Sequence, residues 1–385
     1  QAWTRLLFNV GQIQARYDEA LSLSVGAEAA LARAGDPPSM RAGLESTMGT
    51  VEWRRARYDA AVERFARAES LILASVGPDD PRLRQIINNR GVVMLSQGRL
   101  DEAQLQFERG LSHARKAFGP RHPFVADSLL NLGVIHAERS EGVQAQARLE
   151  EALAVLRSAP NQNRQRIGQV LSNLVVATLQ QGELVASRRY ALDARDLLRA
   201  VNGPEHPSVA APIDGLAIIA LCEGDFDAAA AHATEAMALL ERSLGTEHPS
   251  HATVALNLAM VRLEQGRPDE ASTLTAKARD VFDASLTADS RYRLLADGIW
   301  AEAELAHGRA ESAIEPLDRA RGLVEDRFER ARLSFALARA LAAVGRSPER
   351  VDALVAEAAA AYDQLGFAYW RSRVVQWDER RDRAR

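Results

Sequence analysis

Three histidines in this sequence stand directly before a proline, and their type and spacing are the first to consider for chemistry. They are His122, His206 and His248. Imidazole often binds metal ions, but metal ligands have to converge on one point. His206 and His248 are 42 residues apart and His122 precedes His206 by twice that distance, so a regular structure spreads them along a ridge. The sequence therefore predicts no metal site. It predicts that each histidine caps or packs at a helix entry, where the missing N–H of proline costs nothing.

The single cysteine, Cys222, is the next candidate, because a thiolate can act as a nucleophile. No basic cluster that would activate it is evident. The equivalent positions of the chain, found by steps of 42, hold varied polar residues, so we expect Cys222 to be exposed and inert: they are Ser96, Glu138, Gln180 and Glu264. Asp225-Phe226-Asp227 differs in its last residue from the Asp-Phe-Gly of kinases, and we find no nucleotide-binding loop, metalloprotease motif or nucleophile elbow. The sequence predicts no catalytic residues, no cofactor and no enzyme activity in this chain, although a catalytic domain linked outside it is compatible with this.

Small residues recur every 42 positions, and this period organises the chain. One series is Ala103, Ala145, Ser187, Ala229, Ala271 and Ala313, and another is Gly91, Gly133, Val175, Ala217, Ala259 and Ala301. Small side chains allow two helix backbones to approach closely, so these positions predict helix crossings. A pair of helices cannot bury its apolar stripe alone, and a fixed period indicates that similar pairs stack on each other.

The spacing of these small residues resembles the tetratricopeptide repeat. The 42-residue unit and linkers such as Gly203-Pro204-Glu205-His206-Pro207 are similar to the kinesin-light-chain-like subgroup. The resemblance implies an all-α, right-handed superhelical solenoid of about nine helical hairpins in one domain, closed by a capping helix. The repeats are expected near residues 1–35, 39–76, 81–118, 123–159, 165–202, 207–244, 249–286, 289–327 and 328–365, with the capping helix at 367–383.

Composition restricts the function further. The chain has 385 residues, 47% of them hydrophobic and 26% charged, and a net charge of −4. This balance gives no signal for nucleic-acid binding. No apolar run is long enough to cross a membrane, so we expect a cytoplasmic protein. The first residue is Gln1 and a helical pattern is already under way there, so we expect a piece of a longer protein.

A series of asparagines is the strongest candidate for binding. Asn89, Asn131, Asn173 and Asn257 share one position of the first helix of their repeats, and Gly215 interrupts the series. In similar kinesin-light-chain-like repeats this asparagine lines the concave groove and contacts the ligand backbone; the alternative is that it only holds the hairpin together. Three residues later the chain has apolar residues that would form the groove floor: Val92, Val134, Val176 and Ile218.

The C-terminal segment carries a second candidate surface. Trp370, Val374 and Trp377 fall on one face of the last predicted helix. One interpretation is a capping helix packed on the ninth repeat, and the other is a docking or self-association surface.

Together these features predict a scaffold for protein–protein interaction that binds an extended peptide or partner protein in its groove. Segments beginning at residues 16, 34 and 57, Arg-Tyr-Asp-Glu-Ala, Ala-Gly-Asp-Pro-Pro and Arg-Tyr-Asp-Ala-Ala-Val, resemble the C-terminal repeats of bacterial, especially myxobacterial-type, Ser/Thr protein kinases. That resemblance implies the recruiting or sensory arm of a signalling protein. The alternatives are a ligand- or peptide-sensing module of a transcriptional regulator, and the regulatory half of a protease or other effector.

Overall fold

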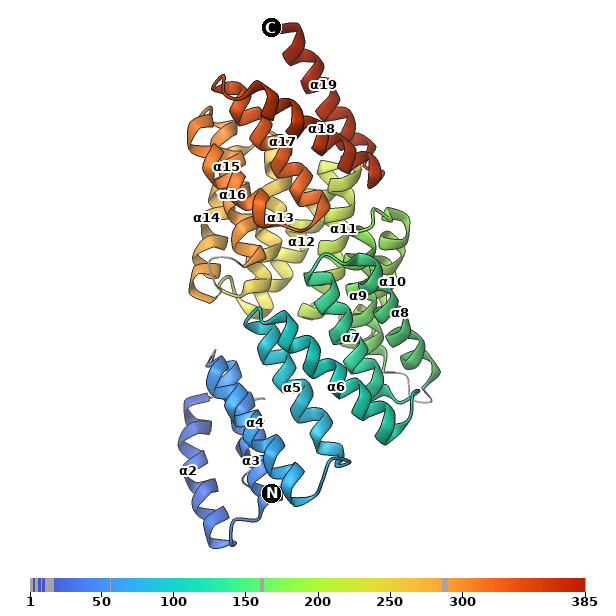
Figure 1. Ribbon diagram of the computed structural model, residues 1–385, viewed down its shortest axis with the longest axis vertical. Coiled ribbons are helices and arrows are strands. Elements are labelled where there is room, and N and C mark those ends of the chain that lie inside the picture. The colour runs from blue at the N-terminus through green and yellow to red at the C-terminus, as the bar shows by residue number, and fades with distance from the viewer. Residues whose placement is uncertain are drawn as a thin grey trace. The chain divides into compact units, whose positions relative to one another are not determined.

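The computed structural model describes residues 17–55, 57–159, 163–285 and 290–384, together with residues 3, 6, 7, 9 and 10. This part of the chain is helical throughout, with 18 helices and no strand (Figure 1). The first helix of the repeat expected at residues 1–35 falls largely outside the described residues. The predicted all-α solenoid of helical hairpins is confirmed.

The helices are α2 (Tyr17–Arg33), α3 (Pro38–Arg54), α4 (Tyr58–Ser75), α5 (Pro81–Ser96), α6 (Leu100–Phe118), α7 (Pro123–Glu138), α8 (Gly142–Ser158), α9 (Arg164–Leu179), α10 (Leu184–Asn202), α11 (Ala210–Glu223), α12 (Phe226–Leu244), α13 (Pro249–Glu264), α14 (Pro268–Ser285), α15 (Arg291–Ala306), α16 (Ala310–Leu323), α17 (Arg327–Ala343), α18 (Pro348–Gln364) and α19 (Ala368–Ala384). From α3 to α18 they alternate as the first and second helices of successive hairpins.

The His-Pro linkers start helices as the sequence predicts. Nδ1 of His248 accepts a hydrogen bond from the backbone N–H of Ser250 at 3.1 Å, and His206 does the same with Ser208 at 3.2 Å. His122 accepts from the N–H of Phe124, also at 3.2 Å. Each imidazole therefore satisfies a backbone donor that the first helical turn leaves without a partner, and the expected capping role is confirmed.

Each hairpin is held by a close crossing at the small residues. Ala229, Ala271 and Ala313 are fully buried. Each residue of the other series faces a residue of the second helix 16 positions later, and the larger member of the pair can belong to either helix. A Cβ added to Gly91 would lie 2.7 Å from the ring of Phe107, whereas the larger Val175 belongs to the same buried cluster as the small Ala191.

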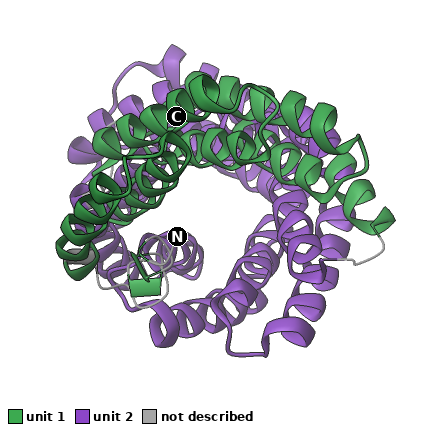
Figure 2. Cartoon of the chain, turned by 90° about the horizontal axis from the view of Figure 1, so that it is seen from below, with its two compact units in different colours: residues 1–135, 151–161 green, residues 136–150, 162–385 purple. Residues whose placement is uncertain are grey.

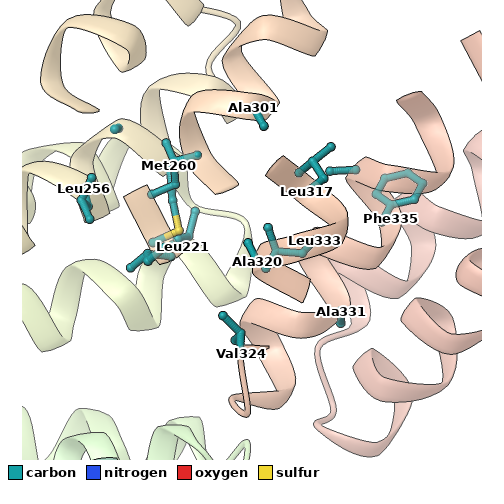
Figure 3. Packing of buried hydrophobic residues seen from close by; sticks show 14 of the residues in the cluster. Leu221, Leu256, Met260, Ala301, Leu317, Ala320, Val324, Ala331, Leu333 and Phe335 are labelled. Atoms are coloured by element: carbon teal, nitrogen blue, oxygen red, sulfur yellow. The ribbon is translucent and has the colours of Figure 1, made fainter. Parts of the chain in front are cut away.

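Contacts divide the chain into two compact units, coloured separately in Figure 2. Unit 1 contains residues 1–135 and 151–161, and unit 2 contains residues 136–150 and 162–385. The largest core lies in unit 2, where Leu221 and Met260 share one apolar cluster with Leu317 and Leu333 (Figure 3).

Within unit 2, consecutive first helices pack on each other, from α9 through α11, α13 and α15 to α17. Consecutive second helices are linked instead by long side chains, as between Arg199 of α10 and Glu235 of α12, whose N···O distance is 2.6 Å. An array in which only one row of helices is in close contact curves toward that row. The first helices therefore form the inner face of unit 2.

Replacing Ala271 by Leu should overfill the α13–α14 crossing, because Ala271 is fully buried there. We expect a loss of about 1–3 kcal/mol in the free energy of unfolding, measured by urea denaturation. Ala276→Leu on the exposed side of the same helix is the matched control and should change little. Equal stability of the two variants would contradict the close crossing.

Candidate binding surface on the inner face

The inner face of unit 2 is most exposed at α9, the earliest of its first helices, and becomes more buried toward α13. Val176 on α9 is 40% exposed, while Met260, two repeats later in the same position, is 6% exposed. Ile218, between them on α11, is half-buried. In unit 1, Val92 on α5 and Val134 on α7 are also half-buried. The apolar floor predicted from the sequence is thus accessible to different degrees along the chain.

The asparagine series makes hydrogen bonds within the chain. Nδ2 of Asn131 donates to Oδ1 of Asn88 at 2.8 Å, and Nδ2 of Asn257 donates to both carboxylate oxygens of Asp214 at 2.9 and 3.1 Å. Both bonds join first helices of neighbouring repeats and support the structural interpretation of these amides. Nδ2 of Asn173 donates to the carbonyl of Gln169 one turn earlier. Asn89 is half-buried on α5. A ligand contact by this series stays a prediction.

Sequence reasoning missed a group of acidic side chains on the inner face of unit 2, which we call the acidic cluster: Glu138, Asp214, Asp326 and Glu329, with Arg291 and Tyr292 among them. These residues come from α7, α11, the start of α15 and the start of α17. Nη2 of Arg291 lies 3.2 Å from Oε1 of Glu329 and 4.0 Å from Oδ2 of Asp326. Asp326 also caps α17, because its carboxylate accepts the backbone N–H of Glu329 at 3.0 Å.

Burial raises the pKa of three carboxylates of the acidic cluster, Glu138, Asp214 and Asp326. Burial raises the pKa of Asp214 to about 6, although the hydrogen bond from Asn257 partly offsets this. Burial and then Glu329 raise the pKa of Asp326, and burial raises that of Glu138, with Glu329 adding to the effect. Arg291 acts in the opposite direction on both groups, and Glu329 in turn raises the pKa of its guanidinium. The cluster therefore contains more carboxylates than positively charged groups that could compensate them.

Helix α19 covers another part of the inner face. The indole N–H of Trp370 donates to the carbonyl of Leu221 at the end of α11, at 3.1 Å. Arg373 forms an ion pair with Glu264 of α13. Helix α19 thus contacts earlier hairpins as well, whereas a terminal cap would contact only the last hairpin.

The side chains of the three residues considered for docking pack largely inside unit 2. Trp370 and Val374 are 2% and 0% exposed, and half-buried Trp377 lies edge-on to Phe335 with ring centroids 5.6 Å apart. Self-association through this helix stays a prediction. Cys222 belongs to the same core as Trp370 and is 3% exposed, so the expectation of a solvent-facing thiol is wrong. Burial raises the pKa of this thiol.

The described residues contain no group of three or more His, Cys, Asp or Glu side chains that could hold a metal ion. None of the helices within them is both long and apolar enough to cross a membrane.

The stacked hairpins, their 42-residue period and the inner row of first helices define an α-helical repeat solenoid. The tetratricopeptide repeat model matches residues 40–116, 88–158, 166–242 and 210–284. These segments cover more than half of the chain, which belongs to the tetratricopeptide repeat family. No curated protein sequence matches it.

Solved structures share this fold at low sequence identity. A Rap protein complexed with competence and sporulation factor is 13% identical, with a TM-score of 0.62 over 100% of this chain and 98% of that chain. The apo form of the quorum sensor NprR from B. thuringiensis is 12% identical, with a TM-score of 0.58 over 92% and 97% of the two chains. A putative kinesin light chain of Podosopora anserina is 22% identical and covers 52% of this chain and 96% of its own, with a TM-score of 0.38.

Replacing Asp214 by Asn should stabilise the protein in a way that depends on pH. The pKa of Asp214 rises on folding from 3.8 to about 6, so its contribution to stability is fully present below the lower value and is lost as the pH rises through 6. Asp214→Asn should increase the free energy of unfolding over that of the parent chain, and this increase should be larger at pH 7 than at pH 4.5 by on the order of 1–3 kcal/mol.

Urea denaturation at the two pH values measures this difference. Asp193→Asn, at an exposed position of α10, is the matched control and should show no such pH-dependent gain. An effect of Asp214→Asn that is the same at both pH values would contradict the role of burial.

Proposed function

We propose that this chain is a scaffold that binds a protein or peptide partner along the inner face of unit 2. The observation that carries the proposal is the accessible stripe of α9, where Val176 is 40% exposed and Asn173 lies three residues before it. An exposed apolar side chain on the first helices, which otherwise pack closely, gives no stability to the free chain, and covering it would favour binding.

The spacing of the first helices suits an extended segment. Packed helices lie about 8–10 Å apart, and an extended peptide advances about 3.3 Å per residue. Neighbouring first helices are therefore matched by roughly every third residue of a bound segment. Apolar residues of such a segment would meet Val176 and Ile218, and amides such as Asn173 offer partners for its backbone.

The second part of the proposal concerns the role of this chain within a larger protein. The resemblance of the N-terminal repeats to those of bacterial Ser/Thr kinases supports the recruiting or sensory arm of a cytoplasmic signalling protein. The full-length likeness to a Rap protein complexed with a factor and to a quorum sensor supports the second candidate, a signal-sensing module of a regulator. In both cases this chain binds and does not catalyse, and the reaction or DNA contact belongs to a linked or separate protein.

Selection of phage-displayed random peptides on the full chain tests the proposal. Selected peptides should bind Val176→Glu at least about tenfold more weakly than the parent, a loss of about 1.4 kcal/mol, measured by calorimetry. Val185→Glu is the matched control, because Val185 is 88% exposed on α10, a second helix. A selection without binders, or binders that ignore Val176→Glu, would show that the inner face is not the binding surface.

A further inference from the structure

The acidic cluster holds more negative charge than the fold needs. Of its four carboxylates, those of Asp326 and Glu329 form ion pairs with Arg291. The nearby guanidinium of Arg332 pairs with Glu302, and that of Arg373 pairs with Glu264. Buried charge without compensation is costly, so an arrangement of this kind favours the binding of a cation.

A second observation identifies an open acceptor within the cluster. Glu329 is 8% exposed, and one of its oxygens is bound by Arg291. The other oxygen, Oε2, is buried and has no hydrogen-bond partner in the described structure. A buried carboxylate oxygen without a donor is rare, and a donor on a bound ligand would satisfy it.

Helix capping explains only half of the cluster. Asp326 and Glu329 stand in the capping positions of α17, where acidic residues stabilise a helix start. Position 214 is different, because Asn88 holds the equivalent place in α5 and accepts the same hydrogen bond from the next repeat. An uncharged amide therefore suffices for the contact between helices.

The charge at position 138 is likewise not a requirement of the repeat. Three of the equivalent positions hold the uncharged residues Ser96, Gln180 and Cys222, and the fourth holds Glu264, whose charge is paired with Arg373. The negative charges of Glu138 and Asp214 thus add nothing that the packing of the first helices demands.

We propose that the acidic cluster is a subsite for a positively charged group of the bound segment, either an arginine or lysine side chain or an N-terminal ammonium. The inference rests on the proposed function, because it places this group on the inner face of unit 2. A guanidinium or ammonium would donate to Oε2 of Glu329 and would face Glu138 and Asp214 in a site of low dielectric, where charge-assisted hydrogen bonds are strong.

Binding of a cation should depend on pH. The groups that act on one another in the site are Glu138 of α7, Asp214 of α11, Arg291 and Tyr292 of α15, and Asp326 and Glu329 of the α17 start, with the Asn257 amide from α13. A bound cation favours the ionised carboxylates, so binding releases protons near pH 6 and weakens as the pH falls below it.

Four pentapeptides of otherwise identical composition test the subsite on the full chain. Three are blocked at both ends and carry arginine, lysine or citrulline at the centre of an alanine sequence, and the fourth is all alanine with a free amino terminus. Calorimetry at pH 7.5 and low salt should show that a charged peptide binds at least about tenfold more tightly than the citrulline peptide, which has nearly the same shape as the arginine peptide but no charge. Preference for the fourth peptide would assign the ammonium as the source of charge.

Variants then connect this preference to the acidic cluster. Asp214→Asn and Glu138→Gln should each reduce it at least about tenfold. Glu315→Gln, at an exposed position of the second helix α16, is the matched control and should leave it unchanged. Because Asn already occupies the equivalent place in α5, Asp214→Asn is expected to fold, and Glu138→Gln gives an independent result if it does not.

Equal binding of all four peptides, binding of none of them, or a preference that survives both substitutions would overturn the subsite. If phage-selected peptides still depend on Val176 in that case, only the cation subsite is wrong and the binding scaffold stands. If the dependence on Val176 is absent as well, the proposed function fails too.

Discussion

The close crossing of two helices in every hairpin is the constraint on which this structure depends. Two backbones can approach closely only where at least one side chain is small, and one member of each facing pair is small in every repeat of the series. Gly49 meets the ring of Phe65, and Gly91 meets Phe107. The hairpin of α9 and α10 has the larger residue on the first helix instead, at Val175, and the small Ala191 on the second. The same interlock therefore forms with different residues, and hairpins of one shape can stack.

Stacking has an electrostatic consequence in unit 2. Because first helices form the inner row, their polar side chains face a confined space with little water around them. There, carboxylates from helices far apart in sequence act on one another, as Glu138 and Glu329 do. Ion pairs on the surface would be screened and contribute little to stability, whereas here the pKa of Glu138 is raised.

The features that the sequence predicts well are periodic or local. The small residues recur in phase, and the His-Pro entries involve neighbours two residues apart, so both can be recognised without coordinates. The acidic cluster could not be found in this way, because its members lie on α7, α11, α15 and α17 and meet only through the curvature of unit 2. The signals in the sequence were indirect. Asp326 and Glu329 form a helix-capping pattern, and Asp214 directly precedes Gly215, which interrupts the asparagine series. Burial of Cys222 was missed for a related reason, since α19 packs across the period and not along it.

The path of α19 also changes how this part of the protein should come apart. A repeat array in which each hairpin contacts only its neighbours can fray from one end, one hairpin at a time. The hydrogen bond from Trp370 to Leu221 and the ion pair from Arg373 to Glu264 span 149 and 109 residues and close a loop around the intervening hairpins. Opening any hairpin between α11 and α19 then costs the closing contacts as well. This stretch should unfold in one cooperative step, with the C-terminal helix acting as a latch.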